Sequence, residues 1–295
     1  MERTSWHNQA LWFVRQKRDR VSKQLPEWEE LRQLAHDIKR YNVTHLDSLL
    51  ERFEAKAQAN GVTVHWAVDA EEHNRIVHGL LEQHGVKSLV KSKSMLSEEC
   101  ELNAYLMARG IDVIESDLGE RILQLMHQHP SHIVMPAIHI KREEVAELFA
   151  REMGTEPGNS DPTYLTHAAR ANLRRHFREA DAAMTGGNFA IAETGEVVVC
   201  TNEGNADMGM ACQKLNICSF GIEKVIESLD QLAVFQRLLA RSATGQASTT
   251  YPPSFRKPKE GGEVHLVILG NGRSCLIADK AHGKLLKCNH NGACV

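Results

Sequence analysis

Residues Thr185–Asn205 read TGGNFAIAETGEVVVCTNEGN and combine glycine-containing turns with two short apolar runs. The runs FAIA and EVVV flank a Glu-Thr-Gly turn, and this pattern predicts a β-hairpin. A structural hairpin needs one set of turn residues, whereas here amides and carboxylates gather at both ends. Polar side chains held at the ends of a rigid hairpin are typical of a ligand site. The polar residues in question are Asn188, Glu193, Asn202 and Glu203.

Strand-like and helix-like segments alternate upstream of this hairpin, from residue 62 to residue 177. Repeated β–α units of this spacing predict an α/β fold with a mainly parallel sheet covered by helices. Asp117 and Asp161 are expected to cap helices, the latter followed by proline at the first helical position. Strands are expected at 62–68, 87–92, 111–116 and 132–138, and helices at 70–85, from 97, at 118–128, 142–153 and 162–177.

The two ends of the chain differ from this pattern. Residues 6–60 show apolar residues at three- and four-residue spacing, so residues 1–60 are predicted to form a helical region. Residues 61–280 are predicted to form the α/β domain, and residues 281–295 a separate tail. Beyond the hairpin we expect a strand at 216–222, a helix at 229–243, a long loop at 244–262 and a second hairpin around Asn271-Gly272.

Composition excludes several classes of function. The chain has 295 residues, of which 42% are hydrophobic and 25% charged, a balance typical of globular domains. A net charge of -3 gives no global attraction to nucleic acid or to an acidic membrane surface. No apolar run approaches the roughly 18 residues of a membrane span, and the first residues lack a secretory-signal pattern. The expected location is therefore the cytoplasm.

The segment Val90–Glu99, VKSKSMLSEE, is the first candidate site. A strand runs into a turn rich in lysine and serine, and a helix follows. Backbone N–H groups at a helix start and nearby lysines attract phosphate or carboxylate groups. A solvated loop before a capped helix is the alternative, and no glycine-rich phosphate loop is present. The candidate ligand-binding residues are Lys91, Ser92, Lys93, Ser94 and Glu99.

The ends of the hairpin are the second candidate site. Glu193 lies at the predicted tip, and a polar group follows the second strand. A carboxylate in such a place can act as a base, a nucleophile or a hydrogen-bond acceptor. Turn chemistry explains Thr194-Gly195 and Gly204-Asn205 but not the neighbouring amides and acids. We therefore name Glu193 and Glu203 as catalytic candidates and Asn188, Thr201, Asn202 and Asn205 as ligand-binding candidates.

Histidines and cysteines offer weaker signals. His132 and His139 flank an apolar segment without the spacing of a metal pair on a helix, so a structural role is favoured. Scattered cysteines in a cytosolic protein are mostly small buried hydrophobic residues. This interpretation applies to Cys100, Cys200, Cys212, Cys218 and Cys275.

The tail KCNHNGACV ends in two further cysteines. A bacterial ferredoxin-type motif runs C-x2-C-x2-C-x3-C-P, because four thiolates must surround one iron–sulfur cluster. Cys288 and Cys294 match its first and third positions, but Asn291 stands at the second. Two thiolates do not hold such a cluster alone, so the tail is an incomplete start of the motif.

Several long motifs, in fixed order, resemble one known family. They are VKSKSMLSEECELNAYLMARGIDVIESDLGERILQL, PSHIVMPAIHIKREEVAELF, the segment 185–205, HLVILGNGRS and LLKCNHNGAC. Together they resemble the lactate utilisation protein B family, including its LUD domain, from about Phe13 to the end of the chain.

This resemblance implies a fold and a function. The LUD domain resembles the ribose-phosphate isomerase/CoA-transferase-like α/β fold. Family members belong to a three-subunit cytoplasmic complex that oxidises L-lactate to pyruvate, and the B subunit carries ferredoxin-like 4Fe-4S motifs after the LUD domain. The family extends beyond Val295, and Asn291 replaces a cysteine. We therefore expect no complete 4Fe-4S cluster in this chain as it stands.

The resemblance and the residues together suggest a mechanism. The turn Lys91–Ser94 and the polar ends of the hairpin are expected to line one pocket beyond the strand ends. Lys91 would bind the carboxylate or phosphate of a small anionic metabolite, and Glu193 or Glu203 would act as a base or acceptor. Two alternatives stay open: a non-catalytic scaffold that docks the other two subunits, and acyl transfer from coenzyme A through a Glu193 anhydride.

Overall fold

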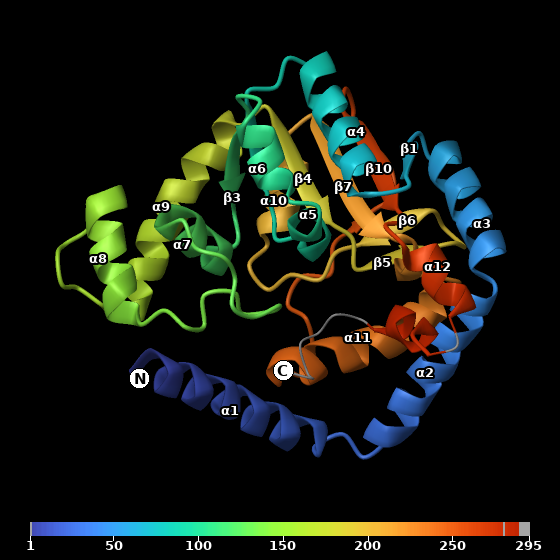
Figure 1. Cartoon of the computed structure of the whole chain (residues 1–295), viewed down its shortest axis with the longest axis horizontal. Helices are drawn as coiled ribbons and strands as arrows, with labels where there is room; N and C mark the ends of the chain where they lie inside the picture. Colours follow the sequence, from blue (N-terminus) through green and yellow to red (C-terminus); the bar gives the residue numbers. More distant parts are fainter. Residues whose placement is uncertain (1, 280, 289–295) are drawn as a thin grey trace.

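A six-stranded sheet forms the centre of the molecule (Figure 1). The computed structural model describes residues 2–279 and 281–288. The strand order is β1-β10-β7-β4-β2-β3, and every neighbouring pair is parallel. The α/β fold with a parallel sheet expected from the sequence is therefore confirmed. The strands are β1 Thr63–Ala67, β2 Ser88–Lys91, β3 Asp112–Glu115, β4 Ala182–Gly186, β7 Leu215–Gly221 and β10 Glu263–Leu269.

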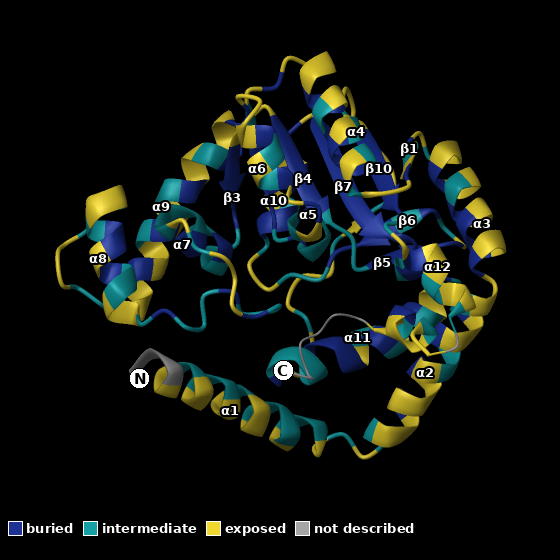
Figure 2. Cartoon of the chain, in the orientation of Figure 1, coloured by how far each residue is buried: buried dark blue, intermediate teal, exposed yellow. Residues whose placement is uncertain are grey.

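Helices cover both faces of this sheet, because its strands are apolar on both sides. On one face α4 and α6 pack over a buried cluster that includes Val77, Leu106 and Ile217. On the other face α3 packs near β7 and β10, and α9 packs over β2 and β3. Figure 2 shows the central strands as buried and the outer helix faces as exposed. The helices named here are α3 Leu46–Ala59, α4 Ala70–Gln83, α6 Leu102–Met107 and α9 Pro162–Glu179.

A second, four-stranded sheet has the order β8-β5-β6-β9. The hairpin expected within Thr185–Asn205 is confirmed as the antiparallel pair β5 and β6. Stacked rings of Phe189 and Phe235, with centroids 5.2 Å apart, join this sheet to α11. The elements are β5 Phe189–Ile191, β6 Glu196–Val198, β8 Val225–Ile226, β9 Ser254–Phe255 and α11 Leu229–Thr244.

The expected helical region at the N-terminus consists of α1 Glu2–Ser22, α2 Trp28–Thr44 and α3. The first two lie along the lower and right edges of Figure 1, next to α11. The third belongs to the core, because Phe53 and Ala57 are fully buried there. The Phe53 ring stands perpendicular to that of Phe220 on β7, with centroids 5.6 Å apart. The boundary at residue 60 stays a prediction.

Side-chain caps set the starts of several helices, because the first backbone N–H groups of a helix lack internal partners. Asp117 caps α7 Leu118–Met126, and Asp161 caps α9, both as expected. The helix expected from residue 97 begins two residues earlier, since Ser94 accepts from the N–H of Ser97 and α5 spans Met95–Glu99. The remaining helices are α8 Arg142–Met153, α10 Asn205–Cys212 and α12 Arg273–Ala278.

Two sequence-based predictions of strands were wrong. The segment 132–138 forms consecutive turns, because the His132 Nδ1 atom accepts from the N–H groups of Val134 and Met135. No second hairpin forms at Asn271-Gly272, since β10 pairs in parallel with β1 and β7 and the chain then enters α12. Gly272, at φ +76°, supplies the left-handed residue before that helix.

No helix among residues 2–279 and 281–288 combines the length and the apolar character that crossing a membrane requires.

The tip of the β5–β6 hairpin lies close to the backbone of α3, and a substitution at Gly195 tests this contact. Gly195 has φ +72°, and a Cβ there would lie 2.4 Å from the backbone nitrogen of Ala57. We expect Gly195→Ala to lower the free energy of unfolding by about 2–4 kcal/mol, since strain and overpacking add. Gly158, at φ +79° with no atom within 4 Å of its Cβ position, is the matched control and should cost about 1 kcal/mol. Urea unfolding compares the two, and equal losses would contradict the close approach.

Candidate functional site

A cavity of about 720 Å³ opens where the parallel strands of the central sheet end. Its walls come from the segments that follow β2, β3, β4 and β7, together with α5, α11, α12 and the loop 130–135. In an open parallel sheet, ligands bind at the carboxyl ends of strands, at the point where the chain order reverses. Here β2 lies between β3 and β4. The chain adds β3 on one side of β2 and then β4 on the other side, so the strand order reverses at β2. The cavity occupies that position.

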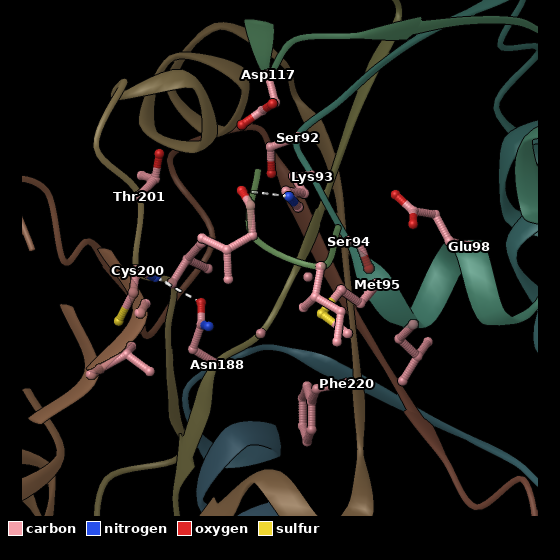
Figure 3. A pocket seen from close by; sticks show the side chains of 18 of the residues that line it. Ser92, Lys93, Ser94, Met95, Glu98, Asp117, Asn188, Cys200, Thr201 and Phe220 are labelled. Atoms are coloured by element: carbon pink, nitrogen blue, oxygen red, sulfur yellow. Dashed lines mark hydrogen bonds between the residues drawn. The ribbon is translucent and has the colours of Figure 1, made fainter. Parts of the chain in front are cut away.

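Most of the candidate residues predicted from the sequence meet at this cavity (Figure 3). Segments about ninety residues apart are brought together because β2 and β4 are neighbours. The Ser92 and Thr185 hydroxyls lie 2.6 Å apart and join the two strand ends. The predicted residues that line the cavity are Ser92, Lys93, Ser94, Glu99, Asn188, Thr201, Asn202, Glu203 and Asn205.

Lys91 does not line the cavity, so its expected contact with a ligand in this cavity is not supported. Lys91 is the register partner of Glu115 on β3, and its Nζ lies 2.8 Å from a Glu115 oxygen. The Ser97 hydroxyl accepts a further bond from Lys91 at 3.2 Å. Lys91 is completely buried in this network. Because of this strand pairing, Lys91 belongs to the buried interior of the sheet and not to the cavity wall.

Lys93 takes the place at the cavity that was expected of Lys91. Its Nζ donates to the Val134 carbonyl at 3.0 Å, which attaches the loop 130–135 to the β2–α5 turn. The nearest carboxylate oxygen is that of Glu120, at 3.7 Å. Lys93 therefore brings a positive charge to a wall built of hydroxyls and carboxyls.

Two carboxyl groups near Lys93, those of Glu120 and Glu203, have raised pKa values. Burial, with the Glu98 and Glu115 charges nearby, raises the pKa of Glu120 to about 8. Loss of hydration and the nearby Asp117 carboxylate raise the pKa of Glu203 to about 7, although the residue as a whole is exposed. Asp117 caps α7, and Glu203 accepts from the N–H of Leu118 in the same helix. Near neutral pH Glu120 therefore keeps its proton for most of the time, and Glu203 is partly protonated.

The amides at the base of the hairpin support its geometry. The Asn188 Oδ1 atom accepts from the N–H of Cys200 at 2.7 Å, as Figure 3 shows. Thr201 donates to the Asn205 Oδ1 atom at 2.7 Å, and Asn202 donates to Gln246 at 2.9 Å. These contacts hold the strand end and the start of α10 against the cavity.

Glu193 lies at the opposite end of the hairpin from the cavity, so the expected pocket shared with Lys91 does not form. Its carboxylate accepts from the N–H of Leu229, at the start of α11. The tip around Gly195 packs against α3. The polar residues at the tip and at the base of the hairpin are close in sequence, but the length of the hairpin separates them in space. The predicted role of Glu193 as base or nucleophile is therefore not supported.

An ion-pair group forms a further part of the cavity wall, and two of its members, Arg273 and Glu223, were missed in the sequence. Arg273 Nη2 lies 2.8 Å from Glu99, and its Nε lies 2.8 Å from the buried Glu223. Glu223 follows β7, Glu99 ends α5, and Arg273 begins α12. Each of these residues lies at or next to an end of a strand or short helix, as Asp117 does after β3. These positions in the sequence would have indicated the site.

His132 and His139 are engaged in hydrogen bonds of their own loop. His139 lies beside the Ser131 hydroxyl at 2.6 Å, while His132 bonds the backbone of its own loop. Cys288 is exposed after η2 Gly283–Lys287, and Cys294 lies outside the described residues. Within the described ranges no group of three or more His, Cys, Asp or Glu side chains is placed to hold a metal ion. The other cysteines vary: Cys100 and Cys218 are buried, Cys200 is half-buried, and Cys212 and Cys275 are exposed.

The raised pKa of Glu120 makes stability depend on pH. The folded state keeps the Glu120 proton up to about pH 8, whereas the unfolded chain releases it near 4.5. Folding therefore takes up a proton between these values, and the free energy of unfolding falls as pH rises from about 5 to 8, by at most about 1.4 kcal/mol per pH unit for this group.

The variant Glu120→Gln should flatten this slope, most strongly around pH 6, roughly midway between the two pKa values, because it cannot ionise. The control Glu179→Gln, at an exposed ion pair on α9, should leave the slope unchanged. Urea unfolding at pH 5 to 9 provides the measurement. A Glu120→Gln slope equal to that of the wild type would show that Glu120 titrates normally.

The chain is similar in sequence to several known proteins. The chain is 40% identical over 282 residues to Lactate utilization protein B of Geobacillus thermodenitrificans, covering 93% of this chain and 59% of that protein. The protein of the same name from Bacillus pumilus is 40% identical over 281 residues, with the same shares. The chain thus spans about three fifths of the length of these relatives. A crystal structure of a DUF162 family protein from Deinococcus radiodurans matches with a TM-score of 0.40 and 14% identity, over 76% of this chain and 98% of that one. The LUD domain description matches residues 50–276, and the chain belongs to the LUD domain family.

Proposed function

We propose that this chain acts in lactate utilisation and that its cavity binds a small 2-hydroxy carboxylate such as L-lactate. The observation that carries the proposal is the position of Lys93, a cation among carboxyl groups with raised pKa values, at the reversal point of the sheet. The similarity to curated proteins named Lactate utilization protein B supports the choice of substrate.

The charges around the cavity favour a ligand with one negative charge. Three basic side chains line it, Lys93, Lys224 and Arg273, and Arg273 is held by two carboxylates. Five acidic side chains line it as well: Glu98, Glu99, Asp117, Glu203 and Glu223. A polyphosphate or coenzyme A would face an excess of negative charge. A single carboxylate requires only one cation, which Lys93 supplies through a charge-assisted hydrogen bond.

The carboxyl pair beside Lys93 suits the second part of such a substrate. Oxidation of a 2-hydroxy acid to a 2-oxo acid removes two electrons and two protons. Glu203, with a pKa of about 7, can accept the hydroxyl proton at neutral pH, and the hydrogen on the 2-carbon leaves with the two electrons to the acceptor. Asp117 lies beside it and stabilises the protonated form. Lys93 and Glu203 would thus bind and deprotonate the substrate.

The electrons require an acceptor outside the groups described here. The resemblance implies 4Fe-4S clusters, but a cluster needs four thiolates. Cys288 is exposed, and no set of described side chains is placed to hold a metal. The tail offers only Cys288 and Cys294, so the residues of this chain do not fit a complete cluster. We propose that the acceptor belongs to the rest of an iron–sulfur complex with two further subunits in the cytoplasm.

Binding of L-lactate to the purified chain tests the role of Lys93. We expect Lys93→Met to weaken binding at least tenfold, because a charge-assisted bond contributes about 1.5–3 kcal/mol. The control Lys87→Met removes an exposed lysine outside the cavity and should bind as the wild type does. Isothermal titration calorimetry at pH 7 gives the dissociation constants. Equal affinity in both variants would reject Lys93 as the carboxylate-binding residue.

A scaffold role is the second candidate, and the surface of α1 favours it. Trp6, Trp12 and Phe13 are 41%, 61% and 65% exposed, an unusual density of large apolar side chains on one helix. The Arg15 guanidinium lies 5.6 Å from the centre of the Trp12 ring. Aromatic residues and arginine are enriched at protein interfaces.

The scaffold role predicts that Trp12→Ser with Phe13→Ser abolishes co-purification with candidate partner subunits while L-lactate binding persists. Deleting residues 1–60 is unsuitable, because it removes Phe53 and Ala57 from the core. A pull-down with purified subunits gives the readout, and Leu34→Ser, an exposed apolar position on α2, is the matched control. Unchanged capture by the double variant would remove α1 as the docking surface.

A further inference from the structure

Three buried side chains form a continuous chain of hydrogen bonds, and one of them, Ser219, lines the cavity. Ser219 on β7 lies with its Oγ 2.9 Å from the Nε2 atom of His73. The other ring nitrogen, Nδ1, lies 3.0 Å from the Oδ1 atom of Asn74. Asn74 in turn donates from Nδ2 to the Cys100 carbonyl at 2.6 Å. Lactate binding, as proposed above, uses none of these residues.

The last contact sets the direction of the whole chain. The Cys100 carbonyl only accepts, so the Asn74 amide presents its NH₂ group there and its oxygen to His73. The His73 Nδ1 atom must then carry the hydrogen, which leaves the Nε2 lone pair facing Ser219. Burial lowers the pKa of His73, so the ring is neutral and able to accept a proton. The Ser219 hydroxyl therefore donates to a free imidazole base.

The position of the three residues is that of a reactive site. His73 lies in the first turn of α4, directly after β1, and Ser219 lies two residues before the end of β7. Both therefore belong to the carboxyl edge of the sheet. Ser219 lines the cavity beside Gly186 and Gly187, which have no side chains. Gly186 is also the register partner of Ser219. Ser219 is fully buried, so a reaction requires local opening of this wall.

We propose that Ser219 is a nucleophile for acyl transfer, with His73 as its general base and Asn74 as the residue that positions the ring. The substrate class is an activated ester or thioester whose acyl group enters the cavity. This arrangement satisfies the geometric requirement of an activated hydroxyl: nucleophile, base and orienting group in hydrogen-bond contact. The proposal is independent of lactate utilisation.

The reaction balances with water as the second substrate. The Ser219 Oγ atom attacks the carbonyl carbon, a carbon–oxygen bond forms, and the hydroxyl proton passes to His73 Nε2. The bond to the leaving alcohol or thiol breaks as His73 returns that proton to it. Water then attacks the acyl-serine, gives its proton to His73, and releases the carboxylic acid while Ser219 regains its hydrogen. Asn74 carries no charge, so it orients the ring and stabilises the imidazolium less than a carboxylate does.

Covalent labelling of the whole chain tests the proposal directly. A fluorophosphonate probe, which phosphonylates activated serines, should add one adduct that peptide mapping assigns to Ser219. Ser219→Ala should give no adduct, and His73→Gln should lower the labelling rate at least a hundredfold, because a general base contributes 10² or more. Ser48→Ala, at an exposed serine on α3, is the matched control and should label as the wild type does.

The labelling of Ser219 in the wild-type chain tests the proposal even if a variant does not fold. Absence of an adduct at Ser219, in a mixture where a known serine esterase reacts, would overturn the proposal. An adduct that forms only in urea, or at the same rate in folded His73→Gln, would also overturn it, since the dyad would then play no part. Thermal unfolding of each variant establishes that it is folded. L-lactate affinity, measured on the same samples, reports separately on the cavity at Lys93.

Discussion

The parallel direction of all six central strands is the constraint on which the rest of the structure depends. Because every strand ends at the same edge, the segments that follow β2, β3, β4, β7 and β10 meet there whatever their distance in sequence. The short order β3-β2-β4 brings Lys93, Asp117 and Asn188 to one wall. The chemistry of this protein is therefore a consequence of strand order.

Burial then determines which of the gathered charges can act. Lys91 and Lys93 are two residues apart, yet the strand register gives Lys91 to Glu115 and leaves Lys93 at the cavity. The carboxyls of Glu120 and Glu203 have raised pKa values because they lose hydration and, to a lesser degree, because other acids lie nearby. Partly protonated acids leave the charge of Lys93 poorly neutralised at pH 7. The same environment lowers the free energy of unfolding as the pH rises. The carboxyl groups that leave Lys93 able to bind a ligand therefore also reduce the stability of the fold.

The sequence was sufficient for most of the elements and for most of the site, and most of the failures arise from contacts between residues distant in the chain. Periodicity, caps at Asp117 and Asp161, and the hairpin in Thr185–Asn205 all depend on neighbours in the chain, and the structure agrees with them. Glu193 and Lys91 failed because hairpin length and strand register decide where a polar group points. His73, Asn74 and Ser219 gave no local pattern, since their contact spans 146 residues. The strand expected at 132–138 was lost to a histidine that bonds its own backbone.

The ion-pair group at Arg273 connects the cavity to the end of the chain. Arg273 begins α12, and its contacts with Glu99 and Glu223 attach that helix to α5 and to the segment after β7. Glu223 also accepts a bond from the buried Lys39 through its carbonyl, which extends the group to α2. Removing one partner of such a buried group leaves an uncompensated charge and costs several kcal/mol. These contacts attach α12 to the cavity wall, and η2, which leads to Cys288, packs against α12 and α2.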